Sequence, residues 1–210
     1  MENKRKRIFM AIVGVCLCGF SVGLFKMSLF GTDPFQCFVN GIWNVFQISF
    51  GTLYTMVNVI MLLCILWLDR HYIGIATFIN IFGLGYIVQY TTELLGRYFV
   101  NSGFTLRIVL LLTGIIIMCF SSSLYYTADL GVSTYDAIAL ILSDKKIAKF
   151  QYCRIGTDLI CVLIGVALHA VVGAGTIITA FFMGPLIEFF NVHISRPFLY
   201  GGREIDKEAV

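Results

Sequence analysis

The sequence predicts an all-α polytopic membrane protein, in which six transmembrane helices form two inverted three-helix repeats, each with a short half-helix after its first span. Three observations lead to this fold class. Of 210 residues, 59% are apolar and 13% charged, against about 45–50% and about 25% in soluble domains. Six apolar runs are long enough to cross a bilayer. The second half of the chain also repeats the first.

The six runs give the order of the expected spans. A bilayer core about 30 Å thick needs about 20 helical residues at about 1.5 Å rise each. The runs lie at 8–30, 50–68, 72–93, 106–127, 153–172 and 174–193. We therefore expect a single membrane domain over 1–210, with a short N-terminus at 1–7 and a C-terminal tail at 194–210.

Two further stretches, 34–48 and 132–143, are helical in character but too short to span the bilayer alone. Each follows a turn that contains glycine, GTDP at 31–34 and GVST at 131–134. We interpret both stretches as half-helices or as helices at the membrane interface.

Basic residues predict the orientation, because cytoplasmic loops are enriched in Lys and Arg. With six spans and the N-terminus inside, Arg97 and Arg107 lie outside and Lys26 lies within the first span. The other twelve are cytoplasmic: Lys4, Arg5, Lys6, Arg7, Arg70, Lys145, Lys146, Lys149, Arg154, Arg196, Arg203 and Lys207. This bias predicts cytoplasmic termini. Counting the short stretches as spans also gives a biased pattern, so their length and not the charge favours six spans.

The internal repeat covers about 7–96 and 107–193. At an offset of 100, residues 7–31 match residues 107–131 at seven positions, and at 99 residues 74–89 match 173–188 at five. The dipeptide Gly51-Thr52 pairs with Gly156-Thr157 at 105. Because three spans is an odd number, the second copy enters the bilayer from the opposite side. Inverted repeats with broken helices at matching positions are typical of transporters with a central binding site.

Three segments resemble the YczE/YyaS/YitT group of bacterial membrane proteins. They are FGTDPFQ at 30–36, LGVSTYDAI at 130–138 and VGAGTIITAFFMGPLIEFF at 172–190. The resemblance covers about residues 7–193 and implies a multi-pass protein of the bacterial inner membrane with five to six spans. It implies no substrate and no catalytic residues.

Polar groups within the apolar segments are the candidate site residues, because a charged side chain in a bilayer costs roughly 2.5–3.5 kcal/mol on insertion scales. The candidates for binding a substrate or ion are Asp33, Thr32, Gln89, Ser133, Thr134, Asp136 and Glu188.

Each candidate also has a structural interpretation. Asp33, before Pro34, and Asp136 are suited to capping the two short helices, and Glu188 to pairing across helices or reaching the headgroups. Asp158, four residues after Arg154, is suited to an ion pair within one helix.

These features favour a small secondary transporter or permease for a solute or ion. The alternative is a non-transporting membrane factor that anchors or assists a partner complex. The sequence contains no G-x-S-x-G, H-E-x-x-H, P-loop or dinucleotide-binding motif, so we expect no enzyme activity, cofactor or metal. The expected partners are the lipid bilayer, a small solute or ion, and a second copy or another membrane protein. The net charge of +3 is too small to indicate nucleic acid.

Overall fold

The structure is a computed structural model that describes residues 2–46, 48, 50–99 and 103–201. It is an all-α fold, as the composition predicts. The elements are α1 (Glu2–Ser28), α2 (Pro34–Phe46), α3 (Phe50–Leu68), η1 (Arg70–Tyr72), α4 (Ile75–Tyr98), α5 (Phe104–Ala128), α6 (Thr134–Asp144), α7 (Phe150–Ala167), α8 (Ala174–Phe190), η2 (Asn191–Ser195) and α9 (Arg196–Tyr200).

Within the described part of the chain, four helical stretches are long and apolar enough to cross a membrane. They are Lys4–Ser28, Phe104–Ala128, Phe150–Ala167 and Ala174–Tyr200. The other two predicted spans correspond to α3 and α4, within which Thr52–Leu68 and Ile75–Leu84 are shorter apolar helices. The chain is thus a multi-pass membrane protein, and the number six stays a prediction.

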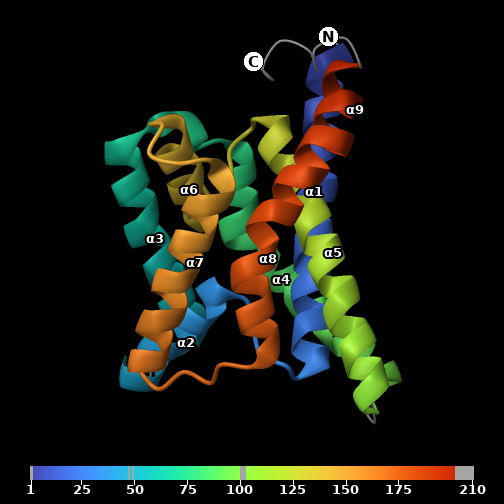
Figure 1. The fold of residues 1–210 in the computed structure, drawn as a ribbon, viewed down its shortest axis with the longest axis vertical. Helices are drawn as coiled ribbons and strands as arrows, with labels where there is room; N and C mark the ends of the chain where they lie inside the picture. The colour runs from blue at the N-terminus through green and yellow to red at the C-terminus, as the bar shows by residue number, and fades with distance from the viewer. Residues whose placement is uncertain (1, 47, 49, 100–102, 202–210) are drawn as a thin grey trace.

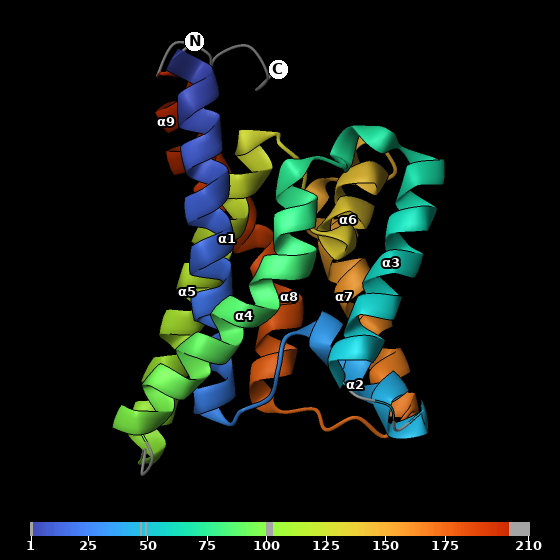
Figure 2. The same ribbon diagram turned by 180° about the vertical axis from the view of Figure 1, so that it is seen from behind.

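The helices form two neighbouring groups (Figures 1 and 2). In one group, α1 and α5 lie side by side with α4 against α1 and α8 against α5. In the other, α2 packs on α7 and α6 packs on α3 and α7, while contacts of α7 with α8 join the groups. The short helix α6 lies toward the end of the bundle where α1 begins, and α2 lies toward the opposite end.

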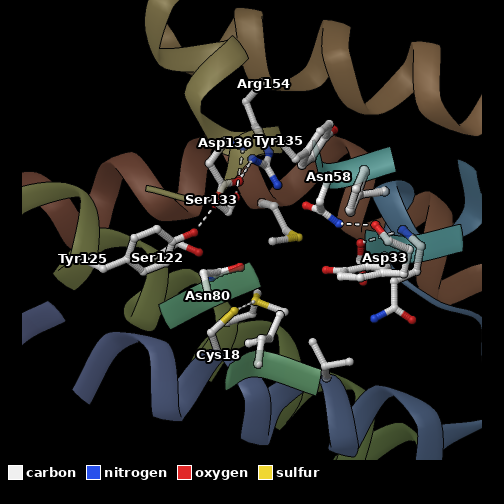
Figure 3. Close-up of a pocket in the computed structure, with 17 residues that line it drawn as sticks. Cys18, Asp33, Asn58, Asn80, Ser122, Tyr125, Ser133, Tyr135, Asp136 and Arg154 are labelled. Atoms are coloured by element: carbon white, nitrogen blue, oxygen red, sulfur yellow. Dashed lines mark hydrogen bonds and ion pairs between the residues drawn. The ribbon is translucent and has the colours of Figure 1, made fainter. Parts of the chain in front are cut away.

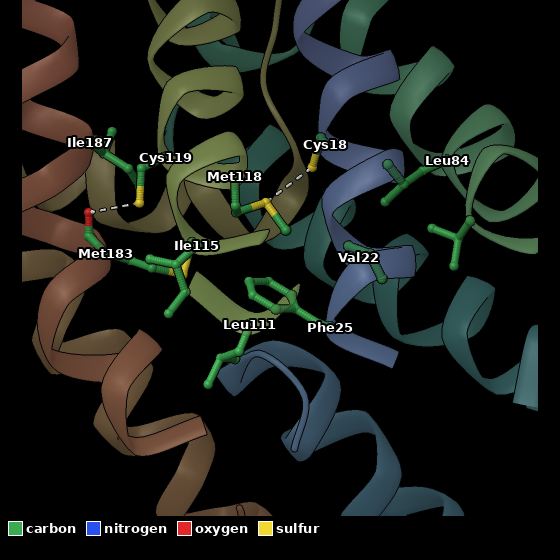
Figure 4. Packing of buried hydrophobic residues seen from close by; sticks show 11 residues of the cluster. Cys18, Val22, Phe25, Leu84, Leu111, Ile115, Met118, Cys119, Met183 and Ile187 are labelled. Atoms are coloured by element: carbon green, nitrogen blue, oxygen red, sulfur yellow. Dashed lines mark hydrogen bonds between the residues drawn. The ribbon is translucent and has the colours of Figure 1, made fainter. Parts of the chain in front are cut away.

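Small residues let α1 and α5 approach closely. A Cβ atom added to Gly14 would lie 3.0 Å from the Cβ of Tyr125, and one added to Gly114 would lie 3.0 Å from the ring of Phe25. Between these crossings lies the largest apolar cluster, which Figure 4 shows. Within it, the Cys18 thiol donates a hydrogen bond to Met118 Sδ at 3.5 Å. The two helices therefore form one tightly packed unit.

The two short helices begin with polar caps. Asp33 Oδ1 accepts a hydrogen bond from the backbone N–H of Gln36 at 3.1 Å, which confirms Asp33 as the cap of α2. In α6 the cap is Ser133, whose hydroxyl accepts from the N–H of Asp136 at 3.1 Å. The prediction that Asp136 caps α6 was therefore wrong, and its carboxylate is directed elsewhere.

The turns that precede the short helices need glycine. Gly31 has φ +110° and Gly131 has φ +98°, values that L side chains rarely adopt. A Cβ on Gly131 would also lie 2.4 Å from the backbone nitrogen of Gly74 at the start of α4. Each turn is thus fixed by backbone geometry and by close packing on another helix.

The last helix is longer than the sequence predicts. α8 continues through the π-helical turn η2 into α9, so residues 194–200, which we assigned to the tail, are helical. Ser123 and Ser195 share a hydrogen bond of 2.7 Å that ties η2 to α5. At the same end of the bundle, Arg7 donates to the Tyr200 hydroxyl at 3.0 Å. The start of α1 and the end of α9 therefore lie together (Figure 1).

Candidate functional site

A small cavity lies where the two helix groups meet (Figure 3). Its volume is about 60 Å³. Cys18 and Met118, which line it, lie near the middle of α1 and α5, so the cavity is at about half the depth of these spans. Most of its lining residues carry a polar group, although the surrounding helices are apolar. The polar lining residues are Asp33, Gln36, Tyr54, Asn58, Asn80, Ser122, Tyr125, Ser133, Tyr135, Asp136 and Arg154.

A buried network of three charged residues lies at one wall of the cavity, and two of them, Asp136 and Arg154, line it. Arg154, in the first turns of α7, makes ion pairs with Asp136 of α6 and with Asp158 one turn further along α7. The Nε of Arg154 lies 3.3 Å from Asp158 Oδ2, which confirms the predicted ion pair within the helix. All three side chains are at least nine-tenths buried. The single guanidinium is thus shared by two carboxylates.

Tyrosine hydroxyls complete this network. Tyr125 donates a hydrogen bond to Asp136, and Tyr135 donates one to Asp158. The guanidinium carbon of Arg154 lies 4.6 Å from the centre of the Tyr135 ring, within the range of a cation–π contact. Each charged group therefore has several partners, as buried ions require.

The opposite wall comes from the first half of the chain. Asn58 of α3 accepts a hydrogen bond from the Thr134 hydroxyl at 2.7 Å and donates one to the carbonyl of Tyr54 at 2.8 Å. The rings of Phe35 and Tyr135 stack with their centres 5.0 Å apart. These contacts join the start of α2 to the start of α6 across the cavity.

The structure brings together only some of the residues that the sequence proposes. Asp33, Ser133 and Asp136 line the cavity, and Thr134 lies behind it. Thr32 does not line it, and the Thr32 hydroxyl is buried without a partner among the described residues.

The two candidates in the long helices lie elsewhere. Gln89 is exposed and donates a hydrogen bond to Glu93 at 2.9 Å. Glu188 is partly buried, its Oε2 atom has no partner among the described residues, and it is not among the lining residues. These side chains therefore do not converge with Asp33 and Asp136.

Sequence reasoning missed the central position of Arg154. We counted it among the cytoplasmic residues, but it is 5% exposed and lies against the cavity. The spacing of Arg154 and Asp158 was visible, yet it was interpreted as a local pair. Asn80 also lines the cavity, although it was not among the candidate site residues.

The arrangement is suited to binding more than to covalent chemistry. Among the described residues, no group of three or more His, Cys, Asp and Glu side chains is placed to hold a metal ion. The fixed charges are held by several partners each, and the cavity is within the helical layer. Such a site can bind a small polar solute or ion inside the bundle.

The chain matches the model of a family described as "Family of unknown function (DUF6198)" over residues 5–192. An "Uncharacterized protein" of Haemophilus influenzae is 24% identical over 192 residues, which cover 91% of this chain and 86% of the relative.

Two Bacillus subtilis proteins are also similar. "Uncharacterized membrane protein YczE" is 20% identical over 84% of this chain and 81% of its own length, and "Uncharacterized protein YyaS" is 19% identical over 91% and 95%. These matches confirm the predicted resemblance to YczE and YyaS. No solved structure matches the chain.

Proposed function

We propose that this chain, a member of the DUF6198 family of unknown function, is a secondary transporter or permease for a small solute or ion in the bacterial inner membrane. The observation that carries this proposal is the polar cavity in the middle of the bundle. Transporters built from inverted repeats hold their substrates near the bilayer midplane, where the repeats meet.

The cavity is lined by equivalent positions of the two proposed repeats. Fourteen of its seventeen lining residues form seven pairs at an offset of 100 or 99. The pairs are Cys18 with Met118, Val22 with Ser122, Asp33 with Ser133, Phe35 with Tyr135, Gln36 with Asp136, Tyr54 with Arg154 and Leu84 with Met183. A two-fold pseudo-symmetry axis through the cavity accounts for this pairing.

Contacts between equivalent residues also support an axis near the cavity. Cys18 contacts Met118, and the ring of Phe35 stacks on that of Tyr135. In a two-fold arrangement, a residue touches its own equivalent only near the axis. Both contacts are in the cavity lining, which supports a binding site at the repeat interface.

Reciprocal backbone contacts also support the repeat. The N–H of Ala76, at the start of α4, donates to the carbonyl of Leu130 at 3.0 Å. The N–H of Gly175, at the start of α8, donates to the carbonyl of Phe30 at 2.8 Å. Each turn after a first helix thus docks on the last helix of the other half. Two halves related by a two-fold axis make such exchanged contacts.

The alignment of the middle helices needs correction. The pairing of Gly51 with Gly156 used an offset of 105, whereas α3 begins at Phe50 and α7 at Phe150. An offset of 100 pairs Tyr54 with Arg154 and Asn58 with Asp158. The two halves thus differ in charge at equivalent positions, so the two proposed repeats contribute different chemistry to the cavity.

The direction of the helices favours opposite orientations of the halves. α2 and α6 lie toward opposite ends of the bundle (Figures 1 and 2). The start of α1 and the end of α9 share one end, as six crossings require. The basic residues of the N-terminus favour a cytoplasmic location for that end. Single cysteines labelled in α2 and α6 should react from opposite sides, and labelling from one side would refute this arrangement.

Transport by this chain would consist of rocking one half against the other around the cavity. The sequence contains no nucleotide-binding motif, so we infer passive or gradient-driven movement. The ion pairs of Arg154 join α6 to α7 and keep that wall intact during such a movement.

Flux measurements in proteoliposomes test the function. Purified wild-type protein should move at least one member of a panel of ions and small metabolites faster than empty liposomes. Asp33→Asn, which keeps the cap of α2, should reduce this flux at least tenfold. Asp129→Asn is the matched control, because Asp129 pairs with Arg7 at the end of the bundle. If wild type moves none of the compounds, the transporter proposal is refuted in favour of the alternative, a non-transporting membrane factor.

A further inference from the structure

The cavity contains polar groups that the protein itself does not satisfy. Asn80 of α4 is 6% exposed and lines the cavity, and its amide points into it (Figure 3). None of the described residues makes a hydrogen bond to the Asn80 side chain. Ser122 of α5 is 3% exposed and also lines the cavity, and its hydroxyl likewise makes no hydrogen bond to a described residue. Buried polar groups are normally paired, so these two oxygens indicate a ligand or ordered water.

Asp33 brings a negative charge to the same cavity. Its Oδ1 atom accepts one hydrogen bond, from the N–H of Gln36. Among the described residues, no Lys, Arg or His side chain pairs with Asp33. A carboxylate inside a membrane bundle without a cationic partner is costly. The missing counter-charge is therefore the second indication of a ligand.

Arg154 does not supply that counter-charge. Its guanidinium is shared by Asp136 and Asp158 and lies over the ring of Tyr135. Counting Asp33, three carboxylates at or beside the cavity face this one guanidinium. The excess charge is negative, which disfavours an anionic ligand and favours a cation.

The volume limits the size of the ligand. A cavity of about 60 Å³ holds about four water molecules, since each needs roughly 10–15 Å³. A sugar or nucleoside does not fit this conformation. Asp136 and Asp158 share Arg154, whereas Asp33 has no charged partner among the described residues, so one positive charge beside Asp33 supplies the partner that it lacks.

We propose that the cavity binds one small monovalent metal cation of the Na⁺ or K⁺ class, with the Asp33 carboxylate as its counter-charge and the amide oxygen of Asn80 as a ligand. Ser122 and retained waters complete the oxygen shell, as hard cations prefer. This inference rests on the proposed function, because it names the substrate or coupling ion of the same site.

The divergence of the two halves supports this assignment. The position equivalent to Asp33 in the second half is Ser133, and the position equivalent to Arg154 in the first half is Tyr54. One half thus holds the charge network around Arg154, and the other holds a carboxylate without a charged partner among the described residues. Asp33 and Asn80 of the proposed cation site come from the first half, and Ser122 comes from the second.

The test is thermal unfolding of the purified full-length protein in detergent. NaCl, KCl or LiCl is titrated against choline chloride at constant ionic strength. At least one alkali cation, but not choline, should raise Tm saturably by about 5–10 °C at a hundredfold excess over Kd. Asp33→Asn and Asp33→Ser, which both keep a good cap, should lose this shift.

Two further variants separate binding from folding. Asn80→Ala should lower the cation affinity about tenfold, and Asp129→Asn should keep it. If the Asp33 variants do not fold, binding of radioactive Na⁺ or Rb⁺ to wild type and to Asn80→Ala decides the question.

Several results would overturn the cation site. These are an equal Tm of wild type in all salts, a shift retained by both Asp33 variants, or an Asp33-dependent stability that responds to pH alone, which assigns a proton instead. Flux without a cation-specific shift in Tm contradicts the cation site but is consistent with a permease. A cation-specific shift in Tm without any flux contradicts the permease but is consistent with the cation site.

Discussion

Replacing Arg154 should destabilise the protein more than replacing the whole charge network. Arg154→Gln leaves Asp136 and Asp158 buried with no positive partner, although both are at least nine-tenths buried. Removing one partner of a buried ion pair costs about 3–5 kcal/mol. For a chain of this size, about 2–4 °C of Tm corresponds to 1 kcal/mol, so Tm should fall by roughly 6–20 °C. Light scattering combined with intrinsic fluorescence in detergent measures this change.

The matched control removes the charges together. The triple variant Asp136→Asn, Arg154→Gln, Asp158→Asn keeps similar shapes and buries no ion, and such replacements are often close to neutral. Its Tm should lie within about 5 °C of wild type and above that of Arg154→Gln. An Arg154→Gln protein as stable as wild type, or a triple variant less stable than Arg154→Gln, would refute the buried network.

Three other expectations concern packing. Gly131→Ala should lower stability by about 1–3 kcal/mol, because Gly131 has a positive φ and the added Cβ would lie 2.4 Å from the backbone nitrogen of Gly74. Gly96→Ala is the control: no atom lies within 4 Å of its added Cβ, so Tm should be unchanged or raised. In a version without other cysteines, Met118→Cys should cross-link to Cys18 under oxidation, since the Cys18 thiol is in contact with the Met118 side chain; no cross-link would contradict the α1–α5 packing. Thr134→Val should cost about 1 kcal/mol, measured by thermal unfolding, because it removes a 2.7 Å hydrogen bond to α3.

The sequence predicts helices better than it predicts their rotation. Apolar length is enough to identify spans, and the Asp33-Pro34 pair is enough to identify the start of α2. Gln89 and Glu188 were chosen only because they are polar within apolar runs. Whether such a residue faces the interior depends on helix rotation, which local pattern does not determine. Both side chains lie away from the cavity.

The charge network around Arg154 could not be predicted from the sequence, for a different reason. Arg154 and Asp136 are 18 residues apart on two helices, and a loop must fold back before they meet. Their pairing follows from tertiary packing of α6 on α7, which no spacing rule describes. The sequence did contain one indication that Arg154 and Asp158 belong to the repeat. At a constant offset of 100, Arg154 is equivalent to Tyr54 and Asp158 to Asn58. We aligned this region at an offset of 105 instead, because of a two-residue match of Gly and Thr.

Accessibility of the cavity from each side of the membrane tests the central claim most directly. Cys18 lines the cavity, whereas Cys119 is fully buried and does not. Each is retained as the single cysteine of the chain in inside-out and right-side-out vesicles and treated with a membrane-impermeant thiol reagent. A permease that alternates its access should let Cys18 react in both orientations while Cys119 stays unreactive. Reaction of Cys18 in only one orientation, or in neither, would contradict the account.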